Sequence, residues 1–247
     1  MSSDQTRIFT KDNLDTYLKE LAKEFRRLNG TAMPGEIVLI GGAAVLANYG
    51  FRDMTADIDA VVHASSSLKE AINRIGDKYD LPRGWLNMDF MQTASYSPKL
   101  DEFSVYYKTF SNVLQVRTIS AEYLIAMKLR SGRKYKSDLS DIIGILAEHE
   151  RQGNPLTLKM INTAVCSLYG GWEDFPEDSR PFIENAIANG DYGKVYSSVK
   201  EEELASKNML LAFEKEYPKV IRESNMDEIL KGLKDRQWNQ SKRGKEK

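Results

Sequence analysis

The stretch IGGAAVLANYGFRDMTADIDAVV, residues 40–62, joins two apolar segments through a glycine pair and carries two aspartates at alternating positions. The mostly apolar run 36–40 predicts a buried strand, and the chain then turns at Gly41-Gly42. The small apolar residues that follow predict a short helix stopped by Gly50, and residues 57–62 predict a second strand. This order of elements begins a mixed pattern of helices and strands.

The two aspartates of the second strand, Asp57 and Asp59, fall on the same face because strand residues alternate between faces. Two neighbouring carboxylates repel each other unless a cation lies between them. A hard divalent ion such as Mg²⁺ relieves this repulsion, since it binds carboxylate oxygens and completes its shell with waters and phosphates. The alternative is a solvated pair at the start of a strand.

The glycine pair favours the metal interpretation. A strand, Gly41-Gly42 and a helix in succession place free backbone N–H groups and a helix N-terminus at one point, which suits a phosphate. Taken alone, the pair is better explained by a tight turn. Together, a phosphate-binding turn and a divalent-metal pair meet the requirements of phosphoryl or nucleotidyl transfer.

The chain around this stretch predicts one mixed unit followed by helices. Helical spacing after Thr10 predicts a first helix, and alternation on either side of Ser111-Asn112 predicts a strand hairpin. Helices are expected at about 120–131 and 137–149, and only helical patterns follow residue 151. We therefore expect an α+β fold, with a mixed sheet flanked by helices over residues 1–148 and a helical annex over 149–247.

Composition excludes several classes of protein. A hydrophobic fraction of 41% supports a folded core, and a net charge of −1 excludes a broad electrostatic surface for nucleic acid. One cysteine and two histidines argue against a disulfide framework or a zinc cluster. The polar N-terminus and the lack of a long apolar stretch predict a cytoplasmic protein without a membrane partner.

The hydrophobic strand, the glycine pair, the helix and then the pattern R-x-x-T-x-D-I-D of residues 52–59 resemble the DNA polymerase beta nucleotidyltransferase superfamily. More narrowly, they are similar to small nucleotidyltransferases of bacterial abortive-infection and toxin–antitoxin systems. The resemblance implies a mixed sheet flanked by helices, with NTP as substrate and Mg²⁺ as cofactor. It covers roughly residues 36–146.

The resemblance assigns roles to residues of this stretch. It makes Asp57 and Asp59 metal ligands and lets the glycine pair, Gly41 and Gly42, hold the triphosphate. Many members have serine at the second of these two positions. Two further residues of the stretch, Arg52 and Thr55, would fix the loop or contact phosphate.

A second segment, AMKLRSGRKYKSDLSDI, carries charges on the apolar faces of two predicted helices. Lys128 and Asp138 either form an ion pair between the helices or, as the resemblance implies, serve as a phosphate ligand and a catalytic or orienting carboxylate. The spacing leaves open whether Asp138 or Asp141 has that function. The basic residues between them, at 133, 134 and 136, either meet substrate phosphates or form a solvated loop.

The sequence leaves open whether a third carboxylate binds metal and what role Trp85 has. Many relatives carry a third metal-binding carboxylate on a later strand, whereas Asp89, Asp101 and Glu102 fall outside convincing strand positions here. Trp85 either stacks on a base or is buried in the core.

The expected function is Mg²⁺-dependent transfer of a nucleoside monophosphate from NTP to a hydroxyl group, with release of pyrophosphate. The acceptor is a tRNA end, a protein side chain or a small molecule, and a toxin-like enzyme with a cognate partner protein falls within this expectation. The alternative is a catalytically inactive binding module or antitoxin-type partner with the same fold.

Overall fold

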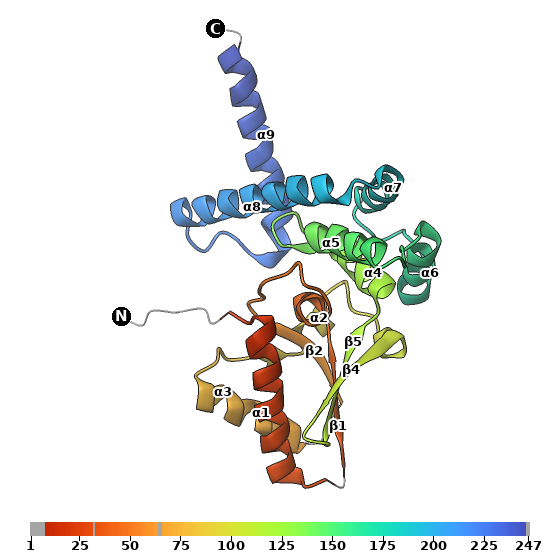
Figure 1. Cartoon of the computed structure of the whole chain (residues 1–247). Helices are drawn as coiled ribbons and strands as arrows, with labels where there is room; N and C mark the ends of the chain where they lie inside the picture. The colour runs from red at the N-terminus through yellow and green to blue at the C-terminus, as the bar shows by residue number, and fades with distance from the viewer. Residues whose placement is uncertain (1–7, 32, 64–65, 246–247) are drawn as a thin grey trace.

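The computed structural model describes residues 8–31, 33–63 and 66–245. Its helices and strands are α1 Lys11–Asn29, β1 Gly35–Leu39, α2 Gly41–Asn48, β2 Ile58–His63, α3 Ser66–Tyr79, β3 Leu86–Asn87, β4 Ser104–Phe110, β5 Leu114–Ile119, α4 Ala121–Ser131, α5 Asp138–Arg151, α6 Leu158–Tyr169, α7 Ser179–Asn189, α8 Tyr192–Glu216 and α9 Met226–Lys245. Short 3₁₀ helices are η1 Asp89–Gln92, η2 Leu100–Phe103 and η3 Glu223–Asn225. The fold is α+β, as the sequence predicts (Figure 1).

The five strands form a mixed sheet in the order β3-β2-β1-β5-β4. The strand β1 is antiparallel to β2 and parallel to β5, and β3 runs parallel to β2. The predicted hairpin of β4 and β5 turns at Ser111 and Asn112, both with positive φ, which matches the right-handed twist of paired strands. Its register shifts between Tyr106 and Lys108.

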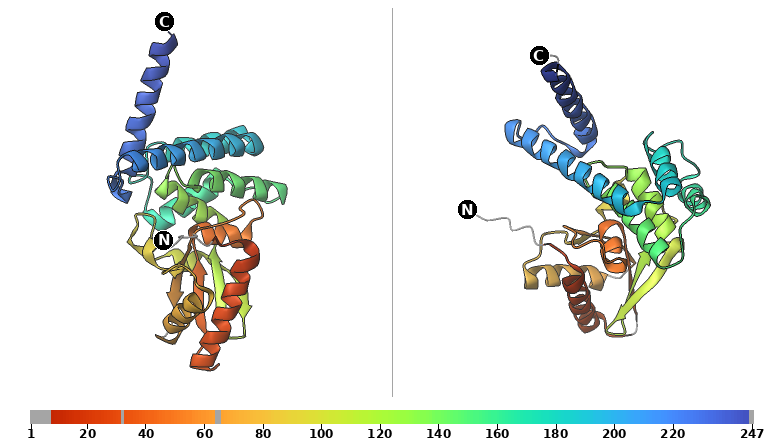
Figure 2. Two further views of the ribbon diagram at one scale, coloured as in Figure 1. Left: turned by 90° about the vertical axis from the view of Figure 1, so that its left-hand side faces the viewer. Right: turned by 45° about the horizontal axis from the view of Figure 1, so that its top comes forward.

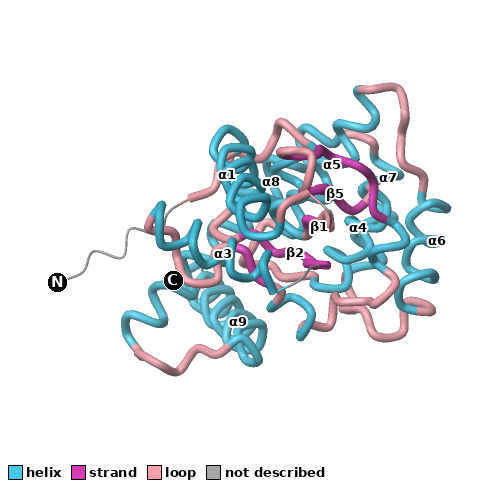
Figure 3. Tube along the Cα trace, turned by 90° about the horizontal axis from the view of Figure 1, so that it is seen from below, coloured by secondary structure: helices cyan, strands magenta, loops and turns pink. Residues whose placement is uncertain are grey.

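The helices α1 and α3 lie side by side along one face of the sheet (Figures 1 and 3). A capping box begins α1, since Asn13 N–H donates to the Thr10 hydroxyl and Thr10 N–H donates to the Asn13 side chain. The apolar stripe of α1, which includes Leu14, Leu18 and Leu21, is fully buried. This confirms the predicted first helix.

The helices α6, α7 and α8 pack on α4 and α5, beyond one end of the sheet (Figure 1). Buried residues of α6 and α7, such as Val165 and Ile183, belong to the same hydrophobic cluster as the sheet. The helix α9 packs through Leu230 against Leu210 of α8 and Tyr135, and its far part projects from the body (Figure 2). The predicted boundary between residues 148 and 149 stays a prediction.

Three details differ from the sequence expectations. The helix α2 begins at Gly41 itself. The strand β2 begins at Ile58, so Asp57 directly precedes it, and the two-residue strand β3 was not expected. Within the described parts of the chain, no helix combines the length and apolar character needed to cross a bilayer.

Candidate active site

The glycine turn and Asp59 lie in contact where β1 ends and β2 begins. The strands are antiparallel, and the backbone N–H of Ile40 donates to the carbonyl of Asp59 at 2.9 Å. Gly41 follows with a φ of 54°, which glycine adopts without strain. A Cβ added to Gly41 would stand 3.3 Å from Oδ2 of Asp59. The structure therefore brings the expected phosphate turn against one of the expected metal ligands.

The amino end of α2 begins at this contact. Ala44 makes the first bond of the helix, donating to the Ile40 carbonyl at 3.2 Å. The amides that precede this bond, including those of Gly41 and Gly42, have no partner within a helix of this kind. Open amides at the positive end of a helix favour a phosphate, so the local geometry suits the predicted role.

Arg52 and Thr55 fold back onto the glycine turn. A Cβ added to Gly42 would lie 2.7 Å from the Thr55 hydroxyl and 2.8 Å from a terminal nitrogen of Arg52. The Arg52 Nε donates to the Met54 carbonyl at 3.0 Å, and Thr55 is held by paired backbone bonds with Phe9. These two side chains occupy the space that a serine at position 42 would need, which explains why this chain has glycine there.

The two aspartates differ in their surroundings. Asp57 is exposed, whereas Asp59 is half-buried. Burial and the charge of Asp57 raise the pKa of Asp59 to about 6, while Lys136 and Arg133 act in the opposite direction and Asp89 raises it further. The carboxylate pair therefore lies within electrostatic reach of the basic loop between α4 and α5 and of a third aspartate.

Asp89 is a residue that the sequence placed outside any convincing strand position. The short strand β3 pairs Asn87 with Asp59 in parallel register, and η1 follows it. The Asn87 side chain accepts the backbone N–H of Asp89 at 2.8 Å and donates to the Gly84 carbonyl at 3.1 Å. This local turn places Asp89 near enough to Asp59 for its charge to raise the pKa of that carboxyl group. Its sequence signal is an asparagine two positions before an aspartate, which is typical of an Asx turn.

Lys128, Asp138 and Asp141 form a buried ion cluster between α4 and α5. The Lys128 Nζ lies 3.2 Å from Asp138 Oδ1 and 2.7 Å from Asp141 Oδ2, and all three residues are at most 5% exposed. Burial acts to raise the pKa of Asp138, but the charges of Lys128 and Arg133 overcome it and lower the pKa. The ion-pair alternative is therefore present in the structure, and it engages both aspartates.

Two arginines join this cluster to the glycine turn and the carboxylates. The Arg133 Nε donates to Asp138 at 2.8 Å, and the same arginine acts on the charge of Asp59. On the other side, Arg52 donates to Asp141 while lying against Gly42. Every residue predicted for the site is thus either at the glycine turn, at the carboxylate pair or in the cluster that links to both.

Trp85 takes the buried one of its two predicted roles. It is 3% exposed, its Nε1 donates to the Ile72 carbonyl at 3.1 Å, and its ring stacks on Phe9 with centroids 6.2 Å apart. Trp85 therefore belongs to the main hydrophobic core.

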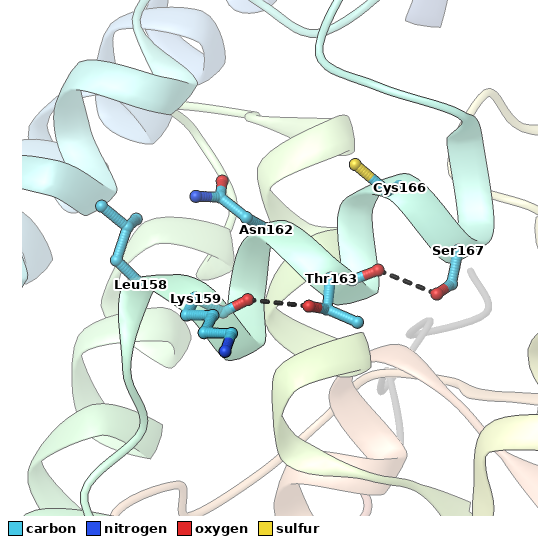
Figure 4. A pocket seen from close by; sticks show the side chains of 6 residues that line it. All are labelled: Leu158, Lys159, Asn162, Thr163, Cys166 and Ser167. Carbon is cyan, nitrogen blue, oxygen red and sulfur yellow. Dashed lines mark hydrogen bonds between the residues drawn. The ribbon is translucent and has the colours of Figure 1, made fainter.

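Two hollows are lined by residues other than Asp57 and Asp59. An open one follows α6, lined by Leu158, Lys159, Asn162, Thr163, Cys166 and Ser167 (Figure 4). The hydroxyls of Thr163 and Ser167 donate to carbonyls of the same helix, so they are already satisfied (Figure 4). The other hollow, a cavity of about 260 Å³, lies between α7, α8 and the start of α5.

The donor set suits a hard cation shared with a substrate. Within residues 8–31, 33–63 and 66–245, no three His, Cys, Asp or Glu side chains are arranged to enclose a metal. Asp57 and Asp59 supply carboxylate oxygens, and Mg²⁺ is commonly held by one or two carboxylates plus waters and phosphates. The raised pKa of Asp59 comes first from burial and then from repulsion by Asp57, and a bound cation would offset both.

Comparison with family models identifies residues 16–149 as matching a family described as "Nucleotidyltransferase of unknown function (DUF6036)". The chain belongs to this nucleotidyltransferase family. The match covers more than half of the chain and spans the glycine turn, the carboxylates and the α4–α5 cluster, and it ends before α6. No curated protein and no solved structure gives a significant match.

Membership confirms the resemblance to nucleotidyltransferases that the sequence motifs carry. The family description leaves the substrates open. It also leaves the roles of individual residues to be argued from the nucleotidyltransferase site itself.

Proposed function

We propose that the protein is a Mg²⁺-dependent nucleotidyltransferase that moves a nucleoside monophosphate from NTP to a hydroxyl group. The observation that carries the proposal is the contact of Gly41 with Asp59. It brings a helix N-terminus suited to phosphate within reach of carboxylates suited to a divalent cation. A nucleotidyltransferase needs a phosphate site and a divalent-cation site at the same point.

In this proposal Asp57 and Asp59 hold the metal, and Asp89 approaches from the turn after β3. When bound, Mg²⁺ neutralises phosphate charge and lowers the pKa of the attacking hydroxyl. The amides of Gly41 and Gly42 hold phosphate oxygens at the start of α2. Arg52 and Thr55 support this turn, because their side chains fill the space beside Gly42.

The chemical step requires little covalent participation by the protein. The acceptor oxygen forms a bond to the α-phosphorus, the bond to pyrophosphate breaks, and the hydroxyl proton leaves to water. Asp138 is a poor base because Lys128 and Arg133 lower its pKa, so we assign it an orienting role. Lys128 lies in the buried cluster beside the site and exchanges a carboxylate partner for phosphate if it acts as a ligand.

The acceptor is a tRNA end, a protein side chain or a small molecule. The basic residues of the α4–α5 loop, Arg133, Lys134 and Lys136, offer phosphate contacts. Arg133 and Lys136 both act on the charge of Asp59, whereas Lys134 pairs with Asp178 at 2.5 Å, which favours Arg133 and Lys136 for this role. A toxin-like activity, a cognate partner protein and a cytoplasmic location stay predictions from the sequence.

The experiment uses each of the four NTPs labelled at the α-phosphate, incubated with the protein, Mg²⁺ and cell extract. We expect a labelled RNA, protein or small molecule that is lost with Asp57→Asn and with Asp59→Asn. Asp53→Asn is the matched control, because Asp53 is an exposed carboxylate of the same loop.

The second candidate function is a binding module without turnover, favoured by the lack of a closed metal-binding cluster in the described residues. It predicts that Mg·NTP binds in a calorimetric titration while no label is transferred. If Mg·NTP bound equally well to wild type, Asp57→Asn and Asp59→Asn, the site assignment would be wrong.

A further inference from the structure

The first turn of α5 is capped from a distant helix. Its N-cap residue, Ser137, makes no side-chain bond to the helix. Instead, Oε1 of Glu203 on α8 accepts the backbone N–H of Leu139 at 2.9 Å and that of Ser140 at 3.2 Å. Oε2 of the same carboxylate accepts the Ser140 hydroxyl at 2.6 Å. One side chain thus supplies what a local N-cap normally supplies.

This carboxylate is costly to bury. Glu203 is 6% exposed, and burial raises its pKa to about 7, although the bonds from Ser140 and Leu139 act to lower it. The neighbouring charge of Asp141 raises the pKa further. An apolar side chain would fill this position without that penalty. Packing alone therefore does not account for a glutamate here.

The turn that Glu203 holds carries the charged cluster of the site. Asp138 and Asp141 both lie in the first turn of α5. Through these two carboxylates the turn fixes Lys128 and Arg133. On the other side it fixes the guanidinium of Arg52, which lies against Gly42. A displacement of this turn would move all of these charges together. Misplacement of catalytic groups by about 1 Å costs on the order of 100-fold in rate.

We propose that Glu203 is a positioning residue of the transfer reaction, fixing the first turn of α5 so that Asp138 and Asp141 hold the charged cluster in place. This inference rests on the proposed nucleotidyltransferase activity. It also makes α8, which lies beyond the residues matched by the family model, a part of the active site.

The test compares Glu203→Met with Glu203→Gln. Methionine keeps the length and volume but accepts no strong hydrogen bond, whereas glutamine keeps an oxygen acceptor and can still pair with the Ser140 hydroxyl. Glu202→Gln is the matched control, because Glu202 is the neighbouring exposed glutamate and pairs only with Lys234 in the described residues. Transfer of label from α-labelled ATP with Mg²⁺ and cell extract is measured across ATP concentrations.

We expect Glu203→Met to lower the rate at saturating ATP at least tenfold, while the half-saturating ATP concentration changes less than threefold. Glu203→Gln and Glu202→Gln should stay within threefold of wild type in both. A Glu203→Met protein that turns over at the wild-type rate would overturn the inference. An equal loss of rate in Glu203→Gln would also overturn the inference, because that variant keeps an oxygen acceptor at position 203.

Two further measurements cover other outcomes. If Glu203→Met does not fold, Ser140→Ala removes the hydroxyl bond alone, and we expect a two- to fivefold fall in the saturating rate; an unchanged rate would contradict the proposal. If wild type transfers label from none of the four NTPs, the proposed function fails. Amide hydrogen exchange then decides the positioning role, since it must speed up at Leu139 and Ser140 in Glu203→Met but not in Glu202→Gln.

Discussion

Lys128 of α4 and Asp141 of α5 form a buried ion pair in which Nζ lies 2.7 Å from Oδ2. Asp141 also binds Arg52, and Lys128 also contacts Asp138. Arg133 binds Asp138 in turn. The pair is therefore the centre of a cluster in which three cations, Lys128, Arg52 and Arg133, face the carboxylates of Asp138 and Asp141. Such a cluster has an excess of positive charge beside the site proposed for a triphosphate.

Replacing Lys128 alone should destabilise the protein. Lys128→Met leaves two buried carboxylates with one cation each, and breaking a buried pair of this kind typically costs about 3–5 kcal/mol. Urea unfolding measures the effect. Lys136→Met is the control, because Lys136 is exposed and its loss should change the unfolding free energy by less than about 0.5 kcal/mol. Equal stability of the two variants would show that the cluster is dispensable to the fold.

A serine at position 42 should disturb the turn. Gly42→Ser places its Cβ 2.7 Å from the Thr55 hydroxyl and 2.8 Å from the Arg52 guanidinium, and we expect a loss of about 1–3 kcal/mol. Gly50→Ser is the control, since nothing lies within 4 Å of a Cβ there. Adding Thr55→Ala should recover part of the loss if the clash is the cause, which thermal melts of the double variant can measure.

Neutralising Asp59 should separate stability from ligand binding. Asp59→Asn removes a half-buried charge that the charge of Asp57 opposes, so the protein without metal should gain about 1–2 kcal/mol. The increase in melting temperature caused by Mg·ATP should disappear in the same variant. A variant that is destabilised without metal, yet keeps the full Mg·ATP effect, would argue that Asp59 is structural.

The burial of Glu203 predicts a pH dependence of stability. Its folded pKa of about 7 lies above the ordinary value of 4.5, so the folded protein keeps a proton that the unfolded chain has released. The resulting stabilisation is complete below pH 4.5 and is lost as the pH rises through 7. The charged groups nearby are Asp141 on α5, Lys134 and Asp178 beside the cavity, and Glu202 on α8.

Glu203→Gln removes this titration. Between pH 5 and pH 8, wild type should lose on the order of 2 kcal/mol relative to the glutamine variant. Urea unfolding of both proteins at several pH values measures the difference. Parallel pH profiles of the two proteins would place the pKa of Glu203 near its ordinary value.

The sequence predicts the parts of the site that follow local patterns. The first helix after Thr10, the apolar run before Gly41 and the alternation of Asp57 with Asp59 all follow patterns within a few residues, where helix and strand periods are visible. The approach of Gly41 to Asp59 also follows, because the glycine turn ends one strand and the aspartates begin its neighbour.

Contacts between distant segments leave no such pattern. Arg52 and Asp141 are 89 positions apart, and Glu203 reaches Leu139 across 64. The strand β3 has two residues, too few for alternation to show, so the place of Asp89 could not be predicted. In the α4–α5 segment the sequence does indicate charges on apolar faces, but the choice between Asp138 and Asp141 has no answer in spacing because Lys128 contacts both.

The register shift between Tyr106 and Lys108 has a consequence for how molecules of this protein meet one another. It lies in β4, the outermost strand on one side of the sheet, where unpaired backbone groups would otherwise invite a strand from a second molecule. An irregular register twists that border, and the ammonium group of Lys108, held 2.7 Å from Asp15, adds charge there. The border is thereby a poor template for aggregation through continuous strand addition.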